Sequence, residues 1–258
     1  MGVDLFLRTN RGLVLTEAGR LLVPAAERAV AAVREAEDTV HGVRAIVSGT
    51  VSLGTFSSAH HYILGDVVAE FRRRYPHVRM RIVGHNSVGV ADAVRNGQLE
   101  AGLVALPVDD RGLEVGTTVW TSEAVYVSAQ PGRTSAPVSI EQVSAADLIL
   151  PEAQWGNDDP TRHQLIDRAQ RAGLVIEPIV EVESPAAALE LAARGVGDTI
   201  VSRTLVSLLH LTDRLSWASL DPPLLESFAF VTRRSTNLSP ATRALIDLAQ
   251  SRLMELHG

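Results

Sequence analysis

Residues 50–61 read TVSLGTFSSAHH, an apolar segment that runs into a short loop with two serines. The segment predicts a strand at Thr50–Phe56, and the residues after the loop predict a helix at Ala59–Tyr75 that Pro76 stops. Three further elements repeat this order: a strand at Val78–Val83, a short helix at Val88–Asn96 and a buried strand at Leu99–Leu106. Strands that alternate with helices in this way predict a parallel sheet covered by helices.

A second run of alternating strands and helices follows this unit. Starting with a strand, its elements are expected at Ala124–Ala129, Ser139–Val143, Leu148–Leu150, Thr161–Ala172, Ile179–Glu183, Ala186–Arg194 and Thr199–Ser202. The tail adds a strand near Ser227–Thr232 and a last helix at Ala241–Leu256. We therefore expect two α/β lobes, with crossings between them at Thr121–Glu123 and Asp221–Leu225. Two crossings predict a cleft in which a small ligand can bind.

The beginning of the chain has a different pattern. Residues 5–20 read LFLRTNRGLVLTEAGR, which fits a β-hairpin with strands at Leu5–Arg8 and Leu13–Leu15 around a turn at Thr9–Gly12. Two strands alone are marginally stable in water, so the hairpin needs something to pack against. Thr16 is a suitable N-cap for a helix that begins directly after the hairpin.

This helix is expected to run to about Ile46, with a kink or a two-part start at Pro24. Its apolar residues alternate in steps of four and three, which is the a/d spacing of a coiled coil and favours pairing with a second helix. These positions are Leu22, Ala26, Ala29, Val33, Ala36, Val40 and Val43. An amphipathic helix that packs on its own domain is the alternative.

The composition excludes several kinds of chemistry. The 258 residues carry a formal net charge of −6, which argues against a basic nucleic-acid-binding surface over the whole chain. There is no cysteine, which excludes disulfides, cysteine-ligated zinc and thiol catalysis. The 24 basic residues are all arginine, so a lysine Schiff base and a phosphate-loop lysine are excluded as well.

The sequence carries no recognisable catalytic or metal-binding motif. His60 and His61 are adjacent in a predicted helix and point about 100° apart, so they cannot hold one metal ion together. The segment Asn157–Asp159 lacks the glycine and glutamate of a calcium-binding loop. We expect no enzyme activity, no metal and no cofactor. No apolar run approaches about 18 residues and the start lacks a signal-peptide pattern, so we expect a cytoplasmic protein without a membrane partner.

The pattern L-F-x-R-x-x-R-G-x-x-L-T-E-A-G resembles the wing and linker-helix start of LysR-type transcriptional regulators. It is carried by Leu5, Phe6, Arg8, Arg11, Gly12, Leu15, Thr16, Glu17, Ala18 and Gly19. The stretches that resemble the effector-binding domain of that family are Val51–Ser58, Val67–Pro76, Val94–Leu103 and Leu191–Ile200.

The resemblance implies an α/β, two-lobed, periplasmic-binding-protein-like effector domain, preceded by a β-hairpin wing and a long linker helix. The expected bounds are 1–15 for the wing, 16–48 for the linker helix and 49–258 for the effector-binding domain. Within that domain, lobe I would comprise about 49–121 and 226–258, and lobe II about 122–225. The chain differs from the family at Arg203, where a proline is usual, and at Asp198, where an apolar residue is usual.

The resemblance also implies partners: a small-molecule effector, DNA in the full-length form, and a second copy in a homodimer or homotetramer. The recognition helix that precedes the wing in this family is expected to be missing, which would make this an N-terminally truncated regulator. Arg8 and Arg11 of the wing are then candidates for contacts with DNA phosphates, which position a protein without specifying a sequence. Ordinary solvated arginines of a hairpin are the alternative.

Candidate ligand contacts lie at the starts of helices, where unpaired N–H groups suit a carboxylate or another anion. Strand-to-helix loops of two-lobed α/β folds face the cleft, and three of these loops carry serine. The candidates are Ser57, Ser58, Ser87 and Ser184, with helix capping as the alternative role for each. His60 could face the cleft as a hydrogen-bond donor, and Trp155 could form a cleft wall, with surface or core positions as the alternatives.

Three other functions stay open on the sequence alone. A transport-type binding protein has the same two-lobe fold, although the wing argues against it. An enzyme on this scaffold is disfavoured because no nucleophile and base are recognisable. A chain that acts only by dimerising with full-length relatives is the third.

Overall fold

The computed structural model describes residues 3–9, 12–23, 25–26, 29, 48–56, 58–209 and 214–255. The predicted hairpin is present as β1 (Phe6–Thr9) and β2 (Gly12–Leu15), which pair antiparallel. Thr16 caps the helix that follows: its Oγ1 accepts a hydrogen bond from the Gly19 N–H at 2.9 Å. The predicted a/d seam beyond Ala29 lies outside the described residues.

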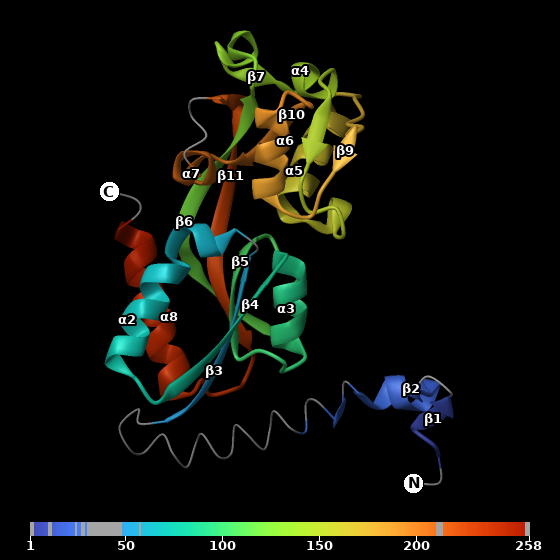
Figure 1. Cartoon of the computed structure of the whole chain (residues 1–258), viewed down its shortest axis with the longest axis vertical. Helices are drawn as coiled ribbons and strands as arrows, with labels where there is room; N and C mark the ends of the chain where they lie inside the picture. The colour runs from blue at the N-terminus through green and yellow to red at the C-terminus, as the bar shows by residue number, and fades with distance from the viewer. Residues whose placement is uncertain are drawn as a thin grey trace.

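The rest of the chain forms two α/β lobes, as the sequence predicted (Figure 1). Lobe I, drawn at the bottom of Figure 1, contains β3 (Gly49–Phe56), η1 (His60–Leu64), α2 (Gly65–Arg74), β4 (Val78–His85), α3 (Ser87–Arg95), β5 (Ala101–Leu106) and α8 (Pro240–Glu255). Lobe II contains η2 (Pro131–Thr134), β7 (Val138–Ser139), α4 (Ile140–Ser144), β8 (Leu148–Leu150), η3 (Gly156–Asp158), α5 (Pro160–Arg171), β9 (Val180–Glu181), α6 (Pro185–Ala193), β10 (Asp198–Ser202) and α7 (Arg203–Leu208).

Two long antiparallel strands, β6 (Leu113–Ser128) and β11 (Ser216–Arg233), run through both lobes. In lobe I, β5 pairs with residues 227–232 of β11, and in lobe II β10 pairs with residues 124–127 of β6. The strand order is β4-β3-β5-β11-β6-β10-β8-β9, so one sheet is continuous through the molecule. The other strands of each lobe pair with a different part of the two long strands.

The sequence identified only one end of each long strand. Residues 216–226 include Pro222 and Pro223, which predict a turn, yet the strand passes through them with a register shift between Ser219 and Leu224. The expected parallel sheet is also mixed: β3 pairs parallel with β4 and β5, whereas β11 pairs antiparallel with β5. The reason is that β6 and β11 serve both lobes, an arrangement that local patterns do not reveal.

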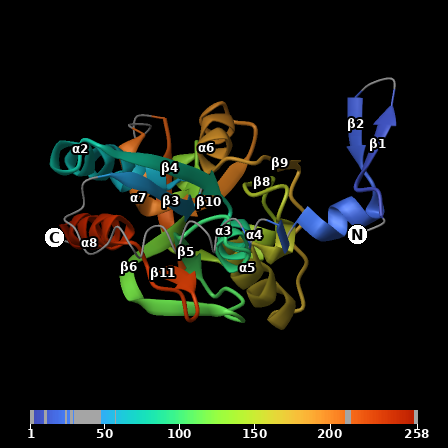
Figure 2. The same cartoon turned by 90° about the horizontal axis from the view of Figure 1, so that it is seen from below.

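Alternating residues give the sheet of lobe I two apolar faces. Leu103 faces the same core as Phe71 of α2 and Leu245 of α8, and α2 packs beside α8 (Figure 2). The other face packs against α3, where Val90 lies over Gly102 so closely that a Cβ on Gly102 would be 2.3 Å from Val90 Cγ1. Glycine at this position therefore allows the close approach of α3.

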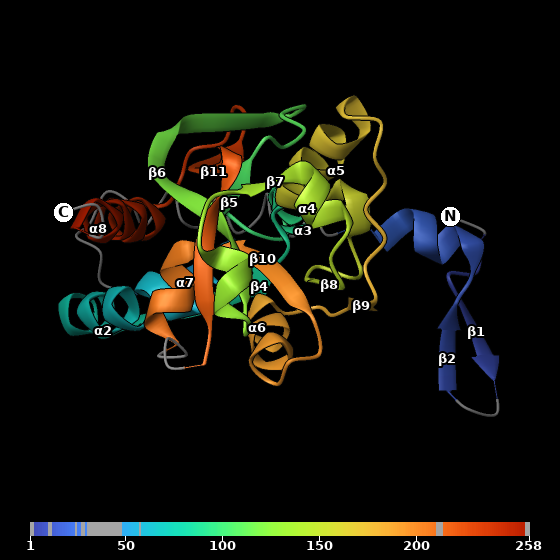
Figure 3. The same cartoon turned by 90° about the horizontal axis from the view of Figure 1, so that it is seen from above.

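Lobe II is layered in the same way. Leu148 and Leu150 share a core with Leu165 of α5, while Ile149 between them shares a core with Leu189 of α6. Because neighbouring strand residues point to opposite faces, α5 and α6 lie on opposite sides of these strands (Figure 3). Within the described part of the chain, no helix is both long and apolar enough to cross a bilayer.

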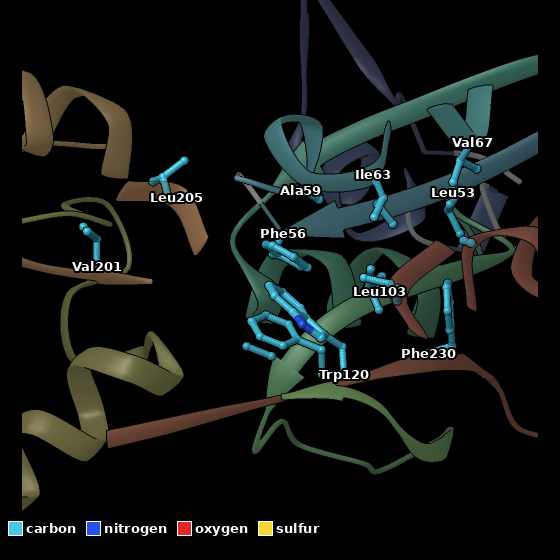
Figure 4. Packing of buried hydrophobic residues seen from close by; sticks show 14 of the residues in the cluster. Leu53, Phe56, Ala59, Ile63, Val67, Leu103, Trp120, Val201, Leu205 and Phe230 are labelled. Atoms are coloured by element: carbon cyan, nitrogen blue, oxygen red, sulfur yellow. The ribbon is translucent and has the colours of Figure 1, made fainter. Parts of the chain in front are cut away.

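An aromatic group closes the core where the lobes meet. The ring centroid of Phe56, at the end of β3, lies 4.6 Å from that of Phe228, which in turn stacks on Trp120 at 4.7 Å. Val201 and Leu205 belong to the same apolar cluster and approach Phe56 from lobe II (Figure 4). Phe56, Phe228, Val201 and Leu205 also form the apolar wall of a cavity between the lobes.

Candidate functional site

A cavity of about 70 Å³ lies between the two lobes. Lobe I contributes the ends of β3 and β5 and the start of α3, and lobe II contributes the ends of β8 and β10 and the starts of α5 and α6. Phe56 and Phe228 provide apolar walls. The carboxyl ends of strands and the starts of helices thus meet at one place, which is where α/β folds commonly bind ligands.

Asn86 connects the lobes at this cavity. Its Oδ1 accepts a hydrogen bond from Val88 N–H at 2.9 Å and so caps α3. Its Nδ2 donates across the cavity to Asp159 Oδ2 at 2.8 Å and to Glu152 Oε2 at 3.1 Å. All three residues are buried. Both amide hydrogens of Asn86 are therefore used by carboxylates of the opposite lobe.

Asp159 in turn caps α5. Its Oδ1 accepts from the N–H groups of Thr161 and Arg162, at 3.0 and 2.8 Å. Burial raises the pKa of Asp159, and its hydrogen bonds from Arg162, Asn86 and Thr161 partly offset that rise. The caps of two helices in different lobes are thus joined by a single side-chain hydrogen bond.

Glu226 of β11 is the third carboxylate at the cavity. Its Oε1 accepts a hydrogen bond from Thr161 Oγ1 at 2.5 Å, while its Oε2 is buried and has no hydrogen-bond partner. Burial raises the pKa of Glu226 to about 7, and the charges of Asp159 and Glu152 add to this rise. A group that titrates near neutral pH inside a cavity is typical of binding and catalytic sites.

Glu152 has an unusual backbone conformation. Its φ is 62°, in the left-handed region that a residue with a side chain adopts at a cost of about 1–3 kcal/mol. The conformation places Glu152 at the end of β8, where its carboxylate accepts from Asn86. Strain of this kind is concentrated at ligand-binding and catalytic sites.

The charged side chains of described residues that line the cavity are carboxylates: Glu152, Asp159 and Glu226. Arg162 is close in sequence and buried, but it does not line the cavity. Its guanidinium donates to the Pro151 carbonyl oxygen at 3.2 Å and to Glu181 Oε1 at 2.9 Å. The charged groups that line the cavity are therefore acidic. The sequence had indicated helix starts with unpaired N–H groups, which suit an anionic ligand.

Two of the serines predicted from the sequence line this cavity. Ser58 follows β3, and Ser87 is the first residue of α3. Ser87 Oγ accepts a hydrogen bond from Ala105 N–H at 2.8 Å, which ties α3 to β5, and its own hydroxyl hydrogen remains available. Ser57, Arg11 and the side chains of His60 and Arg8 lie outside what the structure describes.

Trp155 and Ser184 do not line the cavity. Trp155 is partly exposed and precedes η3. Ser184 is exposed at the start of α6 and makes no capping hydrogen bond, although the next residue, Pro185, lines the cavity. Their predicted roles in ligand binding would require a different arrangement of the cleft and stay predictions.

The two departures from the family pattern make contacts elsewhere. Asp198 is buried and accepts hydrogen bonds from Tyr126 Oη and from Arg133, the latter at 2.5 Å. Burial and this carboxylate raise the pKa of Tyr126. The Arg203 guanidinium lies 5.7 Å from the ring centroid of Trp217. Neither Asp198 nor Arg203 lines the cavity.

The polar lining residues that were not predicted as ligand contacts are Asn86, Glu152, Asp159, Thr161, Ser202 and Glu226. Asn86 stands in a loop already singled out for Ser87, so its position was accessible from the sequence. Glu226 was hidden because β11 was not recognised as one long strand.

Two α/β lobes joined by two long strands around an acidic cavity place the protein in the class of periplasmic-binding-protein-like domains. The LysR substrate binding domain family matches residues 44–254. The chain therefore belongs to the LysR family of transcriptional regulators. The family and the relatives that match are regulators, which agrees with the expectation that this chain is not an enzyme.

Similarity to individual proteins points in the same direction. The HTH-type transcriptional regulator YeiE of Escherichia coli is 28% identical over 250 residues, which cover 96% of this chain and 82% of that protein. The effector binding domain of BenM, solved with its effector benzoate, has a TM-score of 0.66 at 19% identity and covers 82% of this chain and 95% of its own.

Full-length CbnR, solved with its target DNA complex, has a TM-score of 0.68 at 16% identity and covers 97% of this chain and 85% of its own. At these identities the solved structures establish the fold.

Proposed function

We propose that this protein binds a small molecule in the cavity between its lobes and that binding alters how the regulator acts on DNA. The observation that carries the proposal is the contact of Asn86 with Asp159 and Glu152 across the cavity. A ligand placed there would meet the groups that hold the two lobes together in this arrangement.

The contact suggests how a ligand changes the protein. Asn86 caps α3 and Asp159 caps α5, so a ligand that replaces the hydrogen bond between them can move two helices relative to each other. An effector shifts such an equilibrium only if it binds one arrangement of the lobes better than the other. Competition for the Asn86 amide provides that difference in affinity.

The remaining parts of the proposal follow the family resemblance. The linker helix would pair two copies into a homodimer or homotetramer, and Arg8 and Arg11 of the wing would contact DNA phosphates. A regulator that must reach DNA would work in the cytoplasm. Ser57, in the loop before η1, and His60, the first residue of η1, would approach the ligand.

The predicted anionic effector is less well supported by the contacts. Two N–H groups at the start of α5 already donate hydrogen bonds to the Asp159 carboxylate. One N–H group at the start of α3 donates to the side-chain oxygen of Asn86. The start of α6 has no side-chain cap and is the feature that favours an anion.

A thermal-shift screen of small metabolites tests the proposed function. Ser58 lines the cavity, so Ser58→Trp is expected to fill it and to abolish the stabilisation by any hit. Ser135→Trp is the matched control, because Ser135 is exposed and distant from the cavity. A hit that stabilises Ser58→Trp and the parent chain equally would show that the cavity is not the binding site.

A further inference from the structure

We propose that the cavity selects a ligand with a small cationic hydrogen-bond donor, such as a primary ammonium group, held by Glu226 together with Glu152 and Asp159. This inference rests on the proposed function, since it assigns a chemical class to the ligand of the same cavity. It reverses the sign of charge expected from helix starts alone.

The first argument is an unused acceptor. Glu226 Oε2 is buried and has no hydrogen-bond partner, while its Oε1 is occupied by the Thr161 hydroxyl. A buried acceptor without a donor is costly, and natural structures leave few of them. An ammonium group offers three donors and no acceptor, so it can satisfy Oε2 without adding an unpaired acceptor of its own.

The second argument is the count of donors around the cavity. The amide hydrogens of Asn86 go to Asp159 and Glu152, and the hydroxyl hydrogen of Thr161 goes to Glu226. The lining hydroxyls of Ser58, Ser87 and Ser202 can serve either role, and Ser202 shares a hydrogen bond with Ser122. Among the lining side chains, acceptors therefore exceed donors, and a ligand that supplies donors completes them.

The third argument is charge. Three carboxylates come from three separate segments: the end of β8, the start of α5 and the middle of β11. The nearby cation Arg162 is held by Pro151 and Glu181. A carboxylate ligand in this small space would add a further negative charge to the group, whereas a cation would be attracted by all three.

Matched three-carbon probes test the inference: n-propylammonium, propanoate and 1-propanol, at equal ionic strength and pH 8. Their small size suits a cavity of about 70 Å³. Binding is measured by ligand-observed NMR titration, with Ser58→Trp to establish that the signal arises in the cavity. We expect n-propylammonium to bind most tightly. Propanoate binding more tightly than n-propylammonium, or no cavity binding of n-propylammonium, would overturn the inference.

Glu226→Gln provides a second test, because it should weaken the binding of n-propylammonium and strengthen the binding of propanoate. The amide keeps an acceptor for Thr161 but removes the charge, so n-propylammonium should bind at least about tenfold more weakly. Tighter binding of propanoate by this variant agrees with the same charge argument. Glu190→Gln on α6 is the control, since Glu190 is exposed and pairs with Arg194 away from the cavity. Unchanged n-propylammonium affinity in Glu226→Gln would contradict the assignment.

The two proposals fail in different ways. If the metabolite screen yields an anionic hit that Ser58→Trp abolishes, the cavity is the effector site and the cationic ligand class is wrong. If every hit survives Ser58→Trp, the proposed function itself is wrong.

Discussion

The side-chain amide of Asn86 donates a hydrogen bond to the Asp159 carboxylate at 2.8 Å, and each of these residues caps a helix in a different lobe. One short contact therefore connects the start of α3 with the start of α5. Two helix starts that are normally independent become coupled, and any ligand that enters between them acts on both.

Asn86→Ala is expected to destabilise the protein by about 3 kcal/mol. It removes the cap of α3, worth about 1 kcal/mol, and takes one hydrogen-bond donor away from each of two buried carboxylates, Asp159 and Glu152. Urea denaturation followed by circular dichroism measures the free energy of unfolding.

Asn86→Asp separates these contributions, because it keeps a capping oxygen but adds a fourth carboxylate. It should cost more at pH 8 than at pH 5, because Glu226, whose pKa is raised to about 7, is largely protonated at pH 5 and ionised at pH 8. A loss well under 1 kcal/mol in Asn86→Ala would show that the contact across the cavity contributes little.

Glu226 should make the stability depend on pH. Burial raises its pKa from 4.5 to about 7, so the folded state favours the protonated carboxyl. The stability associated with this group is fully present below about pH 4.5 and is lost as the pH rises to about 7, amounting to about 3 kcal/mol at most.

Glu226→Gln removes this penalty. Its free energy of unfolding should exceed that of the parent chain at pH 8 and match it near pH 4, as measured by urea titrations at both values. The control Glu190→Gln should show no such difference. An equal effect of Glu226→Gln at both pH values would argue against a raised pKa.

Gly102→Ala is expected to destabilise lobe I by about 1–3 kcal/mol, because its Cβ would lie 2.3 Å from Val90 Cγ1. Gly84→Ala is a matched control, since Gly84 also lies in a strand but has open space where a Cβ would be placed. Thermal denaturation compares the two. Combining Gly102→Ala with Val90→Ala should recover part of the loss, and strict additivity would mean that the contact is not the cause.

Most helices and short strands of the two lobes were predictable because their signals are local. The strand predicted at Leu148–Leu150 is present with the same bounds, and the helix predicted at Thr161–Ala172 is present as Pro160–Arg171. The full lengths of the long strands β6 and β11 were not predictable. Both contain polar residues in their middle parts, and β11 also contains two prolines, which are typical of loops. Their extent depends on pairing with each other over a long distance in sequence. The bounds proposed for the domains stay a prediction.

The sequence indicated loops that lead to the cavity but did not indicate the carboxylates that line it. The loops after the first strands do lead to the cavity, and Ser58 and Ser87 do line it. Helix starts suggested an anion because they carry partial positive charge. In the folded chain, Asn86 and Asp159 accept hydrogen bonds from the N–H groups at these helix starts. Glu226, from a strand remote in sequence, places a further carboxylate at the cavity. This convergence of three segments cannot be read from any one of them.

Both proposals require a small molecule to bind between Asn86 and Glu226 in the cavity that separates the lobes. A crystal structure of the chain with the strongest hit of the metabolite screen would locate that molecule. We expect ligand density within hydrogen-bond distance of the Glu226 carboxyl, with the contact between Asn86 and Asp159 changed or shared. Ligand density at another place, with this cavity and its hydrogen bonds as described here, would contradict this expectation.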